Sequence, residues 1–122
     1  MRILMIEDNE SNAYLARFLL ERRGHEVVVA VTGGEGVACA RTSAYDLVLL
    51  DLRLPDGDGC DFVRGIVAPE GGKIPPVVAV SAHALAADRA RAIEVGCSAF
   101  IEKPIDVNTF TDRIEKIASA QP

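Results

Sequence analysis

Five polar residues come at the ends of short apolar runs, and their side-chain types could carry out phosphoryl chemistry. They are three carboxylates, a hydroxyl and an amine: Glu7, Asp8, Asp51, Ser81 and Lys103. Carboxylates that lie close together repel one another unless a cation joins them, and hard oxygen ligands without His or Cys suit Mg²⁺. A carboxylate beside Mg²⁺ and a lysine can attack phosphorus and form an aspartyl phosphate. The hydroxyl and the amine would then hold the phosphoryl oxygens.

These side chains would meet at one edge if the apolar runs are strands of one parallel sheet. The pattern predicts five strands, at 3–6, 27–31, 46–50, 77–80 and 99–101. Helical spacing predicts a helix after each strand, at 11–23, 34–43, 61–68, 84–95 and 107–118. Most of the strands are near-continuous apolar runs, as expected for a parallel sheet covered on both faces. The predicted fold class is therefore α/β, a (βα)₅ doubly wound five-stranded parallel sheet, in which ligands bind at the carboxyl ends of the strands.

Length and composition exclude several classes of protein. The 122 residues suit a single domain, with a core over about 2–118 and a loose C-terminal tail at 119–122. With 13 Lys and Arg against 18 Asp and Glu, the net charge of −5 argues against nucleic acid as a partner. No apolar run approaches the ~20 residues of a membrane span, and the early acidic residues argue against a signal peptide. We therefore expect a cytoplasmic protein without a membrane partner.

The three cysteines predict reduced thiols. Cys39, Cys60 and Cys97 are odd in number and lack a CxxC spacing. Neither a disulfide framework nor a zinc site is therefore expected.

Taken in order along the chain, these motifs resemble the response-regulator receiver domain of two-component signalling, including the single-domain chemotaxis regulators. The resemblance spans nearly the whole chain and rests on Glu7-Asp8, Asp51 with Leu54-Pro55 and Gly59, Ser81-Ala82, and Lys103-Pro104. It implies a flavodoxin-like receiver fold. It also implies that Asp51 is the phosphoacceptor, and that Asp8 and Asp51 bind Mg²⁺ together with the main-chain carbonyl of Arg53. Glu7 would help to position the metal through water.

The same resemblance assigns roles to residues of the last two strands. Ser81 and Lys103 would contact the phosphoryl group, while Ser81 and Phe100 would act as the switch residues. The peptide bond before Pro104 would be cis. Four positions depart from the commonest pattern. Glu7, Ser81 and Phe100 stand where Asp, Thr and Tyr are more usual, and Gly57 stands where a larger apolar residue is frequent. Each keeps the essential chemistry, although Phe100 has no hydroxyl to bond when its ring turns inward.

As a function, the resemblance implies a phosphoacceptor response regulator in a phosphorelay, and not an enzyme beyond self-catalysed transfer to Asp51 and hydrolysis from it. The donor would be a histidine kinase or a histidine phosphotransfer protein. Phosphorylation would change binding to a downstream protein target, and the chain would be a monomer or a weak homodimer. The responding face, made by the fourth helix, the fifth strand and the fifth helix, would include Ala84, Ala90, Val95, Phe100, Val107 and Ile114.

Arg53 and His83 carry a separate hypothesis. Each lies two residues past a site residue, Asp51 and Ser81 respectively. We expect their side chains to tune the lifetime of the acyl phosphate by controlling the access of water. The alternative is that both are exposed loop residues without a kinetic role.

Four other interpretations of the sequence remain open at this point. It could be the receiver domain excised from a hybrid histidine kinase, or a receiver fold that binds partners and is never phosphorylated. A magnesium-dependent phosphatase with an aspartyl nucleophile would need a second Asp where Arg53 stands. A flavin-binding protein of the flavodoxin type would place a phosphate beside Glu7 and Asp8, which would repel it.

Overall fold

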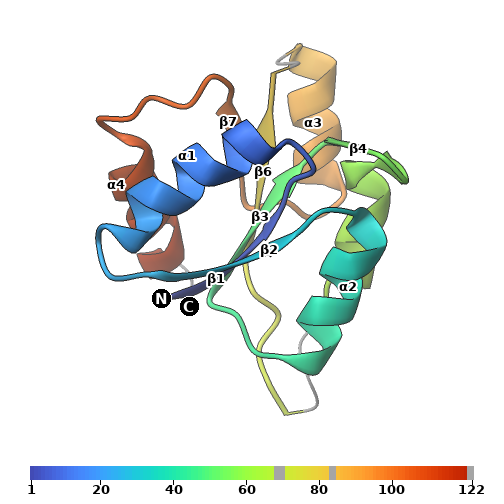
Figure 1. Ribbon diagram of the computed structural model, residues 1–122. Coiled ribbons are helices and arrows are strands. Elements are labelled where there is room, and N and C mark those ends of the chain that lie inside the picture. The colour runs from blue at the N-terminus through green and yellow to red at the C-terminus, as the bar shows by residue number, and fades with distance from the viewer. Residues whose placement is uncertain (68–70, 83–84, 121–122) are drawn as a thin grey trace.

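The computed structural model describes residues 1–67, 71–82 and 85–120. Five parallel strands form its main sheet in the order β2-β1-β3-β6-β7 (Figure 1). They are β1 (Arg2–Ile6), β2 (Glu26–Ala30), β3 (Leu47–Asp51), β6 (Val77–Ser81) and β7 (Ala99–Glu102). The predicted sheet is confirmed, and the chain reverses its direction of winding at β1, between β2 and β3. This strand order opens a crevice at the carboxyl ends of β1 and β3.

Helices cover both faces of the sheet, which explains why its central strands are almost wholly apolar. One face is covered by α1 (Glu10–Glu21) and α4 (Phe110–Ser119) (Figure 1). The other face is covered by α2 (Gly33–Thr42), the 3₁₀ helix η1 (Gly59–Gly65) and α3 (Ala86–Glu94). All residues of β3 and β6 are buried. In the described part of the chain, no helix is both long and apolar enough to span a membrane.

The third predicted helix, at 61–68, is wrong in type and in boundaries. The structure has the 3₁₀ helix η1 instead, and Ala68 lies outside the described residues. The helix begins early because the Asp58 side chain accepts a hydrogen bond from the Cys60 amide. The stretch predicted as a plain turn before it contains an antiparallel hairpin, β4 (Arg53–Leu54) with β5 (Gly57–Asp58).

The last two predicted helices begin later than expected. The fourth helix begins at Ala86, with Leu85 as its N-cap, and Ala84 lies outside the described residues. The fifth helix begins at Phe110 and not at residue 107, because Asp106 holds the preceding turn by accepting hydrogen bonds from the amides of Asn108 and Phe110. It runs through Ser119, which was predicted to lie in the tail.

The three cysteines lie in the core or against it. Cys60 and Cys97 are buried, Cys39 is half-buried, and all three are free thiols. Burial raises the pKa of Cys97 to about 11. This thiol therefore stays protonated at neutral pH and is a poor nucleophile.

Candidate functional site

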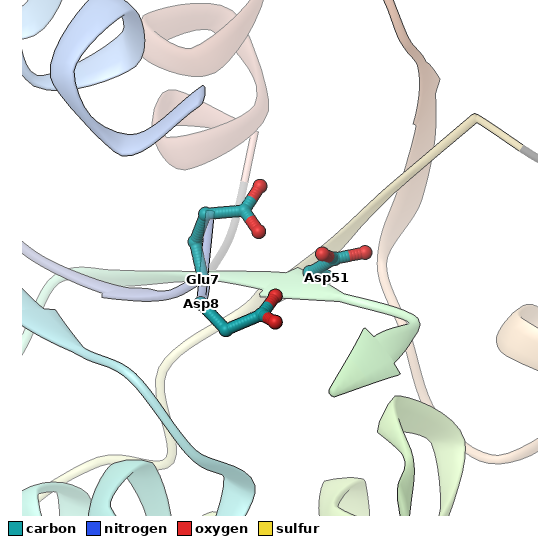
Figure 2. A group of neighbouring side chains, drawn as sticks. All are labelled: Glu7, Asp8 and Asp51. Atoms are coloured by element: carbon teal, nitrogen blue, oxygen red, sulfur yellow. The ribbon is translucent and has the colours of Figure 1, made fainter. Parts of the chain in front are cut away.

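Three carboxylates meet where β1 and β3 end. The pairing of Ile6 with Leu50 aligns the two strands, so that Glu7 and Asp8 emerge beside Asp51. One oxygen from each of these three carboxylates lies within 4.8 Å of the others. Figure 2 shows the three side chains extending into the same space beside the end of β3. Glu7 and Asp51 are buried, with 6% and 8% of their surface exposed, whereas Asp8 is open to solvent.

Lys103 brings an amine to this cluster from the end of β7. Its Nζ lies 2.5 Å from Oε1 of Glu7 and 3.3 Å from Oδ2 of Asp51. The Lys103 amide donates to the Ser81 carbonyl at 2.9 Å, which holds the ends of β6 and β7 together. The peptide bond between Lys103 and Pro104 is cis, as the resemblance implied. The structure thus brings together four of the five residues that the sequence singled out.

The buried acids make this cluster attractive to a cation. Burial, together with a hydrogen bond to Asp51, raises the pKa of Glu7 to about 7, and Lys103 opposes this rise. A raised pKa means that the Glu7 carboxylate retains a proton closer to neutral pH, because burial and the neighbouring Asp51 disfavour its charged form. A hard divalent cation could take the place of that proton. The donor set of carboxylate oxygens from Glu7, Asp8 and Asp51 therefore fits Mg²⁺.

The fifth residue, Ser81, lies at the end of β6 and is 1% exposed. It lines a hollow of about 350 Å³ between the β4–β5 hairpin and α3, together with Arg53. The Arg53 amide donates to Oδ1 of Asp51 at 3.1 Å, while the Arg53 side chain is exposed. Its counterpart in the lifetime hypothesis, His83, lies outside the described residues.

The loop after Asp51 is held by contacts that the sequence did not reveal. A Cβ at Gly59 would lie 2.3 Å from the Asp51 carbonyl oxygen, so this close approach requires glycine. The Asp56 carboxylate accepts hydrogen bonds from the amides of Gly33 and Gly34, both at 2.9 Å. These bonds lower the pKa of Asp56 and tie the loop to the first turn of α2.

The predicted switch and docking residues are only partly at the surface. Phe100 is 8% exposed, and the Arg89 guanidinium lies over its ring. Ala90 and Val107 are exposed, and Val95 is half-buried. Ile114 is a residue of α4 that is fully buried and belongs to the core, so the prediction that it lies on a docking face was wrong.

Comparisons with known proteins agree on one family. A family model described as the response regulator receiver domain matches residues 3–115. The polar-differentiation response regulator DivK of Brucella ovis is 36% identical over 113 residues, which cover 93% of this chain and 92% of the relative. The non-phosphorylated HemR receiver domain of Leptospira biflexa is 37% identical, with a TM-score of 0.85 over 99% of this chain and 96% of that one.

A further solved structure bears on the carboxylate cluster. It is the receiver domain of a sensor histidine kinase from Pseudomonas aeruginosa, with a magnesium ion coordinated in its active-site cleft. It is 30% identical to this chain, with a TM-score of 0.85 over 97% of each chain.

Proposed function

We propose that this chain, which belongs to the response-regulator receiver family, accepts a phosphoryl group on Asp51 and thereby changes its affinity for protein partners. One observation carries the proposal. The carboxylates of Glu7, Asp8 and Asp51 converge within 4.8 Å, and the Lys103 amine lies 3.3 Å from Asp51. A buried nucleophile beside a cation site and a fixed amine has the arrangement that phosphoryl transfer needs.

The metal would be held by side chains and by one main-chain group. The carboxylates of Asp8 and Asp51 and the carbonyl of Arg53 are the proposed ligands, with Glu7 positioning the ion. When bound, Mg²⁺ reduces the repulsion between the site carboxylates and the oxygens of an incoming phosphoryl group. Every other part of the reaction falls to the chain's own residues.

In the proposed reaction, a carboxylate oxygen of Asp51 attacks the phosphorus of a phosphohistidine on the donor protein. The new O–P bond forms as the P–N bond breaks, and the imidazole of the donor keeps the electron pair. Lys103 then neutralises the phosphoryl oxygens, and the Ser81 hydroxyl donates a hydrogen bond to one of them. In a separate hydrolysis step, water attacks the phosphorus, the bond between Asp51 and phosphorus breaks, inorganic phosphate and a proton are released, and the Asp51 carboxylate is restored. Because the phosphoryl group is retained on the chain's own Asp51 until it is hydrolysed, we propose a switch and not an enzyme that turns over a separate substrate.

The proposed donor is a histidine kinase or a histidine phosphotransfer protein, and the proposed output is binding of a downstream protein. Arg53 lines the hollow next to Ser81, which supports the hypothesis that its side chain limits the access of water to the acyl phosphate. We expect Arg53→Ala and His83→Ala to change the half-life of the phosphorylated chain. Unchanged half-lives in both variants would contradict the hypothesis.

The first experiment is intact-mass measurement after incubation with acetyl phosphate and Mg²⁺, in which the donor releases acetate. We expect a gain of one phosphoryl group, lost with EDTA and in Asp51→Asn. The matched control is Asp112→Asn, an exposed carboxylate on α4, which should be phosphorylated as the parent chain is. A gain that persists in Asp51→Asn would overturn the proposal. So would the absence of a gain both with acetyl phosphate and with a phosphorylated histidine protein.

A generic phosphomonoester provides the test against the phosphatase alternative. Sustained release of phosphate from it would favour an enzyme. The switch predicts none, because Arg53 occupies the position where that class of enzyme places its general acid.

A further inference from the structure

Helix α3 has few apolar anchors. It spans nine residues, and Ala92 is the buried residue among them. Two large apolar side chains at its ends point to solvent, because Leu85 is 71% and Ile93 is 52% exposed. The N-cap residue Leu85 offers no side-chain hydrogen bond. Since so short a helix is not stable on its own, other contacts must hold it against the sheet.

One such contact is made by Arg89 with two side chains of β7. The guanidinium carbon of Arg89 lies 4.8 Å from the centre of the Phe100 ring, and its Nη2 donates to Oε1 of Glu102. Phe100 and Glu102 are two residues apart on a strand, so both side chains point to the same face. A planar guanidinium can stack on a ring and pair with a carboxylate at the same time. We call this set of three residues the Arg89 clasp.

A second contact holds the other side of the same helix. Arg91 donates from Nη1 to Oδ2 of Asp58 and from Nη2 to Oδ1 of Asp61, the latter at 3.0 Å. Asp58 ends β5 and caps η1. This set, the Arg91 clasp, therefore ties α3 to the loop that follows the site. All these charged groups are partly open to solvent, so salt screens the attraction between them. Salt does not screen buried apolar contacts in this way.

Both clasps end next to groups of the candidate site. Glu102 pairs in register with Ser81 and directly precedes Lys103. Asp58 and Arg91 line the same hollow as Ser81. If Ser81 or Lys103 moves toward a new negative charge on Asp51, the positions of Glu102 and Asp58, which hold the two arginines, therefore change. Helix α4 also makes ion pairs, from Asp112 and Glu115 to Arg23, but its buried residues Phe110 and Ile114 anchor it to the sheet as well.

We propose that α3 is docked on the sheet by these two arginine clasps, and that Arg89 positions Phe100. Docking through exposed charges makes α3 the helix that loosens first when salt rises or when the charge at the site changes. Only the link to phosphorylation rests on the proposed function, because the docking follows from contacts that need no phosphoryl group.

Amide hydrogen exchange followed by NMR tests the docking. It is measured at low salt and at about 0.5 M NaCl, where the Debye length falls to about 4 Å. Loss of one clasp, in Arg89→Gln or Arg91→Gln, is expected to speed exchange in α3 about fivefold, and loss of both to speed it more. High salt should do the same in the parent chain. Exchange in α4 should change much less, because Phe110 and Ile114 anchor that helix by burial.

Arg17→Gln is the matched control, since Arg17 makes an exposed pair with Glu21 within α1. It should leave exchange in α3 unchanged. The proposal fails if the double variant exchanges in α3 as the parent chain does. It also fails if α1 and α4 lose protection to the same extent as α3, because the arginines would then support the whole fold.

A spectroscopic readout separates positioning of Phe100 from general support. The ring resonances of Phe100 should shift in Arg89→Gln and stay in place in Arg91→Gln. Arg89→Lys keeps the charge beside Glu102 and loses the planar stack, so it should restore protection of α3 in part without restoring the ring resonances. Equal ring shifts in the two Gln variants would overturn the assignment of Arg89.

The link to the site is tested by adding acetyl phosphate and Mg²⁺. Exchange in α3 should rise in the parent chain and stay constant in Asp51→Asn. A constant rate in a chain that mass measurement shows to be phosphorylated would overturn the link. If the chain takes up no phosphoryl group while α3 still responds to salt, the proposed function fails and the docking proposal stands.

Discussion

Helices α1 and α3 both begin a few residues after a strand that ends at the site, yet they are held in different ways (Figure 1). Four residues of α1 are buried: Ala13, Ala16, Leu19 and Leu20. Its first turn is capped by Asn9, whose side chain accepts a hydrogen bond from the Asn12 amide at 2.9 Å. Helix α3 buries Ala92, lacks a side-chain cap and relies on Arg89 and Arg91.

This difference divides the site into a fixed side and an adjustable side. Glu7 and Asp8 lie directly before α1, so two of the carboxylates that would hold a metal are positioned next to a helix anchored by apolar burial. Ser81 and Arg53 face α3, whose anchors are exposed charges. Burial contributes a stabilisation that ionic conditions hardly change, whereas exposed ion pairs are weak and sensitive to nearby charge. The proposed switch would use both properties, one to keep the site residues in place and the other to respond to a change of charge.

The largest expected contrast is in core truncation. Leu20→Ala removes a fully buried side chain of α1 and should lower the free energy of unfolding by about 3 kcal/mol. Ile93→Ala, at a half-exposed position of α3, should change it by less than about 0.5 kcal/mol. Urea unfolding measures both. Similar losses in the two variants would remove the contrast between the helices.

The next expected effect is a pH dependence of the free energy of unfolding, caused by Glu7 on the side of the site next to α1. Burial raises the pKa of Glu7 from 4.5 to about 7, so between these values the folded chain binds a proton that the unfolded chain has lost. Without a divalent cation, this proton binding by Glu7 stabilises the folded chain. The stabilisation is lost as pH rises from about 4.5 to about 7, so the free energy of unfolding falls over that range. Urea unfolding in EDTA across this range measures the slope, and Glu7→Gln should flatten it. Equal slopes in the two chains would contradict the assignment.

Substitution of the residues that cap α1 and α3 sharpens the comparison further. Asn9→Ala should cost about 1 kcal/mol, because an amide of the first turn of α1 loses its partner. Leu85→Ser should stabilise α3 by about 0.5–1 kcal/mol, since the backbone of Leu85 is already extended, at φ −65° and ψ 148°. Thermal unfolding measures the first change, and slower amide exchange in α3 reports the second. Faster exchange in Leu85→Ser would show that the exposed leucine itself helps to hold the helix.

The smallest expected effect is that of an ion pair on the fixed side. Arg17→Gln breaks the i,i+4 pair with Glu21 on the surface of α1 and should change the free energy of unfolding by about 0.5 kcal/mol or less. Exchange within α1 should also stay close to that of the parent chain. A large increase there would mean that α1, like α3, depends on surface charges.

Local pattern was enough to predict the sheet and the position of its polar residues. The apolar runs ending at Ile6, Leu50 and Val80 are dictated by burial on both faces, which is a property of a few adjacent residues. Because parallel strands end at the same edge, Glu7 and Asp51 were predicted to meet without knowledge of any contact. The resemblance then supplied the cis bond before Pro104 and the family, both of which are confirmed.

The tertiary structure alone decided how the loops and α3 are held. The Arg89–Glu102 and Arg91–Asp58 pairs join residues 13 and 33 positions apart. An exposed arginine has many possible partners along a chain, so its choice depends on which segments the fold brings near it. The replacement of the third helix by η1 and the burial of Ile114 have the same origin, since neither is set by neighbours in sequence. The sequence by itself determined which groups stand at the site, whereas packing decided how each is held and which can move.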